Sequence, residues 1–203
     1  MTTPFRIPAQ TTTIQTEVAR SKFIATVYNA DSVESARSIL STHRASMLDA
    51  SHHVYAFRVG FGSSVIEGLS DDGEPSGTSG PPIMNVLRGS ELGDTLIVVT
   101  RYFGGTLLGT GGLVRAYSEA AALAIKACPT VLKVEYAHLH ILIEYSVFTV
   151  FKRMLPDYEA EIISESFSDS IELQVTVPAP HVEGLIAAVT NLTSGSAYIE
   201  RIA

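Results

Sequence analysis

The chain has 203 residues, of which 46% are hydrophobic, with a single cysteine and a formal net charge of −7. The hydrophobic content excludes a mainly disordered chain, and a single cysteine excludes an internal disulfide. The negative net charge excludes a protein that coats nucleic acid indiscriminately, because such binding uses many lysines and arginines to displace phosphate counterions. Aliphatic runs such as Leu96 to Val99 are far shorter than the roughly 20 residues of a spanning helix. Because the first residues carry neither a basic leader nor an apolar signal stretch, we expect a soluble, cytoplasmic protein.

The first part of the chain shows strand and helix patterns in mixed order. Asp31 and Glu34 have the spacing of a capping box ahead of a helix. The pair Gly80 and Pro81 can open a second helix, because proline suits a first helical turn. A third helix is expected from Thr110, with apolar residues on one face. Strand patterns cover residues 22–28, 53–59 and the continuous apolar run 95–100.

The segment Cys128-Pro129-Thr130 is the best candidate for a domain boundary, because a helix must stop before the proline. It predicts one domain over 1–129 and a second over 130–203. Up to Pro129 there are 10 Lys and Arg against 11 Asp and Glu, and afterwards 4 against 10, so the second part carries most of the negative charge. Its patterns predict strand, helix, hairpin, helix and strand, the ferredoxin-like order β-α-β-β-α-β, over 131–143, 146–155, 161–167, 171–177, 180–192 and 196–202.

Two glycine-rich segments, 70–80 and 101–112, are the most constrained parts of the sequence. The second has the Walker glycine spacing but lacks its lysine, and it does not complete a dinucleotide fingerprint. A glycine loop that leads into a helix N-terminus suits an anion, and Arg101 and Arg115 could add charge; alternatively, both arginines pair with the acids of the first segment. Gly105 and Gly112 are expected to need conformations or clearances closed to larger residues.

Metal and hydrolase sites find little support in the residues. Asp71, Asp72 and Glu74 could hold a divalent cation, but their spacing does not continue into an EF-hand, and turn chemistry explains them as well. The stretch Gly77 to Gly80 is one residue short of a serine-hydrolase elbow. His138 and His140 share a strand face without a third ligand of zinc-site spacing. No catalytic residue, metal or cofactor is therefore predicted.

The two glycine-rich segments together resemble the signature of the IMPACT family, in its bacterial form. The resemblance rests on Ser70-Asp71-Asp72-Gly73-Glu74-Pro75 and on the string Arg101-Tyr102-Phe103-Gly104-Gly105-Thr106-Leu107-Leu108-Gly109. It implies an N-terminal domain of the superfold found in a small-subunit ribosomal protein and in domain IV of elongation factor G, with a left-handed β-α-β crossover, and an α+β fold overall. It also implies that the ferredoxin-like domain is similar to the last domain of that factor.

Eukaryotic members of this family act in translational control by competing for an activator of a stress-response kinase. The resemblance therefore implies a non-enzymatic protein that acts in translation or its regulation by binding RNA, the ribosome or a translation-associated protein. A peptidase-like hydrolase and a pure protein-interaction module remain open as alternatives. The candidate binding residues lie in the two segments and the following helix: Asp71, Asp72, Glu74, Arg101, Tyr102, Gly104, Gly105, Gly109, Thr110, Gly111, Gly112 and Arg115.

Overall fold

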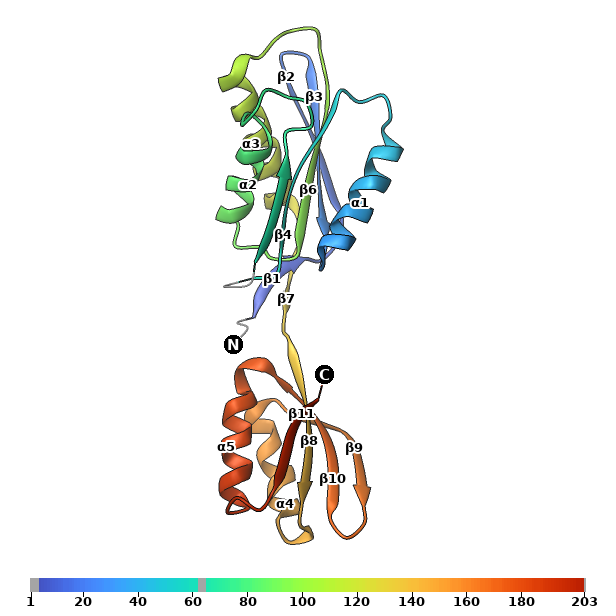
Figure 1. The fold of residues 1–203 in the computed structure, drawn as a ribbon. Coiled ribbons are helices and arrows are strands. Elements are labelled where there is room, and N and C mark those ends of the chain that lie inside the picture. The colour runs from blue at the N-terminus through green and yellow to red at the C-terminus, as the bar shows by residue number, and fades with distance from the viewer. Residues whose placement is uncertain (1–3, 62–64, 203) are drawn as a thin grey trace. The chain divides into compact units, whose positions relative to one another are not determined.

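The computed structural model describes residues 4–61 and 65–202, and the chain divides into two compact units, Phe5–Lys133 and the part from Val134 on (Figure 1). This division lies four residues after the expected boundary between Pro129 and Thr130. The reason is strand pairing: β7 (Thr130–Lys133) pairs antiparallel with β1 (Phe5–Pro8) and so belongs to the N-terminal unit. The mixed α+β fold with two domains is confirmed.

A five-stranded sheet organises the N-terminal unit. Its order is β2-β3-β6-β4-β5, and every neighbouring pair is antiparallel. The strands are β2 (Thr12–Val18), β3 (Ser21–Asn29), β4 (His52–Val59), β5 (Ile66–Ser70) and β6 (Thr95–Tyr102). Because β3 and β4 both run antiparallel to β6, they are parallel to each other, and α1 (Val33–Ser46) is the crossover between them.

Helices cover both faces of this sheet: α1 lies on one face, and α2 (Gly80–Gly89) and α3 (Gly109–Ala127) lie on the other (Figure 1). The central strand β6 is therefore buried on both sides, as its continuous apolar run predicts. Leu96 and Val98 pack in the cluster with α1, whereas Ile97 and Val99 pack with α2 and α3. By the same alternation, Arg101 follows Val99 toward α3.

The starts of α1 and α2 differ from each other in how they are capped. For α1, Ser32 is the N-cap and its hydroxyl accepts from the Ser35 N–H at 3.0 Å, so the helix begins one residue after the capping box expected at Asp31. Ser32 is the N-cap in place of Asp31 because its side chain reaches the third N–H of the helix. For α2, Gly80 and Pro81 open the helix as predicted.

The C-terminal unit has the predicted β-α-β-β-α-β order. It consists of β8 (Tyr136–Ile143), α4 (Tyr145–Met154), β9 (Glu161–Phe167), β10 (Ile171–Pro178), α5 (Val182–Leu192) and β11 (Tyr198–Ile202), with the short 3₁₀ helices Leu155–Tyr158 and Ala179–His181. The sheet order is β11-β8-β10-β9, and its buried residues form a core of their own. The single strand expected over 131–143 is two strands, because β7 pairs in the other unit.

Of the predicted pair His138 and His140, the second forms a contact with a neighbouring strand. His140 Nε2 lies 2.7 Å from an oxygen of Glu172 on the neighbouring strand. Within residues 4–61 and 65–202, no group of three or more histidine, cysteine, aspartate or glutamate side chains is placed to hold a metal. Across the same residues, no helix combines the length and the apolar character that crossing a membrane requires.

A buried histidine ties α1 to the sheet. His43 is 4% exposed; its Nδ1 lies 2.7 Å from the Tyr28 hydroxyl and its Nε2 lies 2.7 Å from the Thr100 hydroxyl. Hydroxyls can donate or accept, so both nitrogens of a neutral imidazole are satisfied. Burial, helped by nearby His53, lowers the pKa of His43 to about 4, and burial lowers the pKa of His53 as well.

Acidification from pH 7 to pH 5 is expected to destabilise the N-terminal unit through His43. The unfolded chain has a histidine pKa near 6.5, whereas the folded pKa is about 4, so between these values the unfolded state binds more protons and stability falls as the pH falls. The loss should reach about 2 kcal/mol at pH 5. Urea denaturation at both pH values measures it. His43→Gln should flatten the dependence, and an equal dependence in parent and variant would contradict this role.

Candidate functional site

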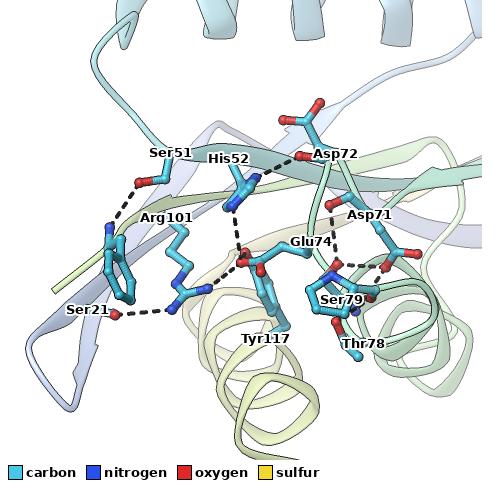
Figure 2. Close-up of polar contacts among 12 residues, drawn as sticks. Ser21, Ser51, His52, Asp71, Asp72, Glu74, Thr78, Ser79, Arg101 and Tyr117 are labelled. Atoms are coloured by element: carbon cyan, nitrogen blue, oxygen red, sulfur yellow. Dashed lines mark hydrogen bonds and ion pairs between the residues drawn. The ribbon is translucent and has the colours of Figure 1, made fainter. Parts of the chain in front are cut away.

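The two glycine-rich segments meet in space through a buried ion pair. Glu74 comes from the first segment and Arg101 from the end of β6, and Arg101 Nη1 donates to Glu74 Oε1 at 2.6 Å (Figure 2). The Tyr117 hydroxyl of α3 donates to the same oxygen at 2.7 Å. Arg101 is only 5% exposed and Glu74 only 8%. Residues that are 27 positions apart in the sequence thus form one polar centre between the sheet and α3.

Aromatic rings and a hydroxyl enclose the rest of the Arg101 side chain. Its guanidinium carbon lies 5.5 Å from the ring centres of both Phe23 and Phe103, and its Nη2 lies 3.4 Å from the Ser21 hydroxyl. The expectation that Arg101 offers its charge to a phosphate is therefore corrected: the charge is buried and already paired with Glu74. Of the two possibilities that the sequence leaves open, Arg101 takes the internal pairing.

His52 completes the polar centre from β4. Its Nδ1 lies 2.8 Å from the backbone oxygen of Asp72, and its Nε2 lies 3.9 Å from Glu74 Oε1 (Figure 2). The next residue, His53, faces the opposite side of the sheet, where its Nδ1 lies 3.1 Å from the Thr100 hydroxyl. The alternation of the strand separates the two histidines, as the sequence predicts.

Asp71 is a capping group for α2. Its carboxylate accepts from the N–H groups of Gly77, Ser79 and Gly80 at 2.8 to 3.0 Å and from the Ser79 hydroxyl at 2.6 Å. Burial raises the pKa of Asp71, but these hydrogen bonds outweigh burial and hold the pKa below its usual value. The Ser79 hydroxyl is thus engaged in fixing the helix start, which gives the stretch Gly77 to Gly80 a structural role.

Asp72 has different partners again. Its Oδ1 accepts from Arg44 of α1 at 2.5 Å, and its Oδ2 accepts from the His53 N–H at 2.7 Å. The three acids of the first segment therefore diverge: Asp71 fixes α2, Asp72 binds Arg44 and β4, and Glu74 binds Arg101. A shared cation would need their oxygens to converge on one point, so this arrangement does not support the metal reading.

The loop after β6 is held close to the β2–β3 turn by a glycine. A Cβ at Gly104 would lie 2.0 Å from the carbonyl carbon of Arg20 and 2.4 Å from the Ser21 nitrogen, so no larger residue fits without moving backbone. Gly105 has φ +83°, as the sequence predicts for a position closed to larger residues. Gly112 lies outside the left-handed region, and its added Cβ would meet Leu108 Cβ at 3.1 Å; only clearance, and not conformation, restricts it.

A cleft of about 420 Å³ opens beside the polar centre. Its polar lining comes from His52, Glu74, Arg101 and Thr110, and its apolar lining from Pro75, Phe103, Leu107, Leu108 and Leu113, with Gly109 between them. The apolar rim is well exposed: Phe103 is 49% and Leu107 is 88% exposed. At one end of the cleft, α3 begins with Leu108 as N-cap, without a side-chain cap and without an acidic residue in its first turn.

The remaining candidate residues do not line this cleft. Arg115 is exposed on α3, and the ion pairs found among residues 4–61 and 65–202 do not include it. The Tyr102 hydroxyl donates to Asp49 at 3.0 Å, outside the cleft. Gly111 is exposed in the first turn of α3. Of the predicted residues, the structure thus brings Glu74, Arg101, Gly109 and Thr110 together in one cleft.

The apolar half of the site was not among the residues predicted from the sequence. The residues concerned are Phe103, Leu107, Leu108 and Leu113, together with His52, Pro75 and Tyr117. The signal for three of them was present: Phe103, Leu107 and Leu108 stand inside a glycine-rich loop, where large apolar side chains have no helix or strand to bury them.

Comparisons with known proteins agree with this domain structure. The Impact N-terminal domain matches residues 19–125, and a domain of unknown function, DUF1949, matches residues 141–196. An IMPACT family member of Haemophilus influenzae is 32% identical over 97% of this chain and 96% of its own. The IMPACT family member YigZ of Escherichia coli is 36% identical over 94% of both chains. A crystal structure of a hypothetical protein superposes with a TM-score of 0.70 at 33% identity, covering 100% of this chain and 99% of the other.

Proposed function

Since the chain belongs to the IMPACT family, we propose that it is a non-enzymatic cytoplasmic protein that acts in translation or its regulation by binding a protein of the ribosome or of a ribosome-bound factor. The contact surface in this proposal is the rim of the cleft, formed by Phe103 and Leu107. The observation that carries it is the exposure of these two residues, which are 49% and 88% exposed.

Apolar side chains grouped on one exposed surface favour a protein partner. A single exposed leucine is ordinary, but a group of them beside a cleft is typical of an interaction site. Gly104, next to Phe103, lies against the backbone of Arg20, which fixes the start of the loop that carries these side chains.

RNA is the less favoured partner at this surface. Phosphate binding draws its affinity from several accessible cations. Arg101 is buried against Glu74, which leaves Arg115 as the exposed arginine on this part of α3. The N-terminal part of the chain is also nearly neutral, with 10 basic against 11 acidic residues up to Pro129.

Substituting Leu107→Ser is expected to weaken co-sedimentation of the chain with ribosomes at least about tenfold, because truncating a central apolar contact removes about 1–2 kcal/mol or more of binding free energy. Sucrose-gradient fractions of a native lysate, probed for the chain, measure the association. Leu132→Ser is the matched control, because Leu132 is 59% exposed but lies on β7 at the other end of the unit (Figure 1). A parent chain that stays at the top of the gradient, or a Leu107→Ser chain that sediments like the parent, would overturn the proposal.

A further inference from the structure

Both helices of the C-terminal unit lie on one face of its sheet (Figure 1). They pack against the side chains of Leu139, Ile141, Leu173 and Val175. Because successive strand residues point to opposite faces, the residues between these form the other face, which we call the open face. By strand and register, its members are Tyr136, His138, His140 and Leu142 of β8, Glu172, Gln174 and Thr176 of β10, Tyr198, Glu200 and Ile202 of β11, and Glu161, Ser164 and Ser166 of β9.

The open face is negatively charged. Three of its members are exposed glutamates, and none of its members is a lysine or an arginine. The basic residues of this unit lie elsewhere: Lys152 and Arg153 are on α4, where Lys152 pairs with Glu165, and Arg201 points toward the helices and pairs with Glu183 of α5. A surface of this charge repels RNA, anionic lipid and a second copy of itself, and it favours a basic partner.

An exposed aromatic ring lies among the carboxylates at one end of the open face. Tyr198 is 51% exposed, and its hydroxyl donates to Glu200 at 2.9 Å. Its ring centre lies 6.1 Å from that of His140, whose Nε2 donates to Glu172 at 2.7 Å. An arginine or lysine side chain can contact such a ring through its cation and bind the carboxylates beside it.

The same combination of groups recurs at the other end of the open face. There, a cleft of about 680 Å³ is lined by Tyr136, Glu159, Glu161 and Thr176, together with Pro156 and Ala160. Tyr136 is 56% exposed, so this end also offers a phenol ring. In the described ranges 4–61 and 65–202, the only ion-pair partner of these two glutamates is His181, 3.8 Å from Glu159. Their charge is thus accessible to a cation from another molecule.

The two ends are spaced for one extended segment. Tyr198 lies opposite Leu142 in the register of β11 and β8, and Tyr136 stands six residues before Leu142 on β8. At about 3.4 Å per residue, the ends are about 20 Å apart, so about six residues of an extended peptide span them.

We propose that the open face docks an extended basic segment of a partner protein, with arginine or lysine side chains about six residues apart at the Tyr198 end and in the cleft beside Tyr136. Charge complementarity selects this occupant. The surface belongs to the C-terminal unit and the proposed ribosome contact to the N-terminal unit, and the test uses the purified chain without ribosomes, so either proposal can fail without the other.

The test compares short peptides that differ in one property at a time. The main probe has seven residues, with arginine at both ends, glycine and serine between them, and both termini blocked. The second probe has citrulline, which is uncharged, in place of both arginines, and the third has its two arginines only two positions apart. In titrations of the full chain followed by amide NMR at low salt, the main probe should shift the signals of both Tyr136 and Tyr198. It should bind at least about tenfold more tightly than either of the others, since an exposed ion pair with a cation–π contact adds about a factor of ten and two linked contacts reinforce each other.

Neutral variants of the same shape locate the two contacts. Glu161→Gln should weaken the main probe about tenfold and abolish the shift of Tyr136, and Glu200→Gln should do the same for Tyr198. Asp169→Asn is the matched control, because it removes the same charge from the turn between β9 and β10; it should bind like the parent. Equal binding of the arginine and citrulline probes, equal weakening in all three variants, or saturable shifts of these signals by an oligouridine would overturn the proposal.

Discussion

Replacing Glu74 with alanine is expected to lower the free energy of unfolding by about 3–5 kcal/mol, because it leaves the buried charge of Arg101 without its partner. The carboxylate is 4% exposed at the side chain and accepts from both Arg101 and Tyr117, so the substitution also leaves a buried hydroxyl without an acceptor. Arg101→Ala should have an effect of the same size. Chemical denaturation monitored at constant pH measures both.

The matched control is Arg115→Ala, which removes an exposed arginine of the same domain. It should change stability by no more than about 0.5 kcal/mol. The double variant Glu74→Ala with Arg101→Ala should lose less than the sum of the two single losses, since neither charge is then left unpaired. Single variants as stable as the parent, or losses that simply add, would show that the pair does not hold the two segments together.

Replacing Gly104 with alanine is the second change with a large expected effect. The new Cβ would lie 2.0 Å from the carbonyl carbon and 2.1 Å from the oxygen of Arg20, so either the loop or the β2–β3 turn must move. Forcing atoms into a packed site costs about 1–3 kcal/mol and occasionally more. The displacement should also disturb the Gly104 N–H, which donates to the Ser21 hydroxyl at 3.1 Å. The midpoint of urea unfolding measures the loss.

Gly111→Ala provides the comparison for this prediction. Gly111 lies in α3, and an added Cβ there meets no atom within 4 Å. Alanine is favoured over glycine in a helix by about 0.5–1 kcal/mol, so this variant should be as stable as the parent or slightly more stable. If Gly104→Ala and Gly111→Ala unfold at the same midpoint, the close approach of the loop to Arg20 is not required for stability.

Local pattern was sufficient to predict most of the fold. The continuous apolar run of β6 predicts a strand buried on both faces, and the pattern after Pro129 predicts each element of the C-terminal domain. The prediction of one long strand over 131–143 was wrong. Nothing in the residues Thr130–Lys133 themselves shows that they pair with Phe5–Pro8, more than 120 residues earlier. Pairing between distant segments depends on the whole fold and leaves no mark in a short window.

At the site, too, some features follow from the local sequence and others depend on residues far away in the chain. The alternation of β6 places Arg101 on the face of Ile97 and Val99, which the sequence alone could have used to predict its burial. The choice of Glu74 as its partner depends on the whole fold. Asp71 binds the helix start only eight residues later, but Asp72 and Glu74 bind Arg44 and Arg101, which are 28 and 27 positions away. The restriction at Gly104 likewise comes from a residue far away in the sequence, Arg20, whose backbone lies against the glycine.

In the proposed function, Arg101 serves the structure, and the rim of the cleft contacts a partner through apolar side chains. The dependence of ribosome association on salt concentration tests it most directly. Phosphate contacts to single-stranded RNA make log K fall by about 0.7 per contact for each tenfold rise in salt, whereas apolar contacts do not release counterions. We predict that association of the parent chain changes little with salt and that Arg115→Ala leaves this dependence unchanged. A steep fall in log K that Arg115→Ala makes shallower would contradict an apolar contact surface and indicate phosphate binding instead.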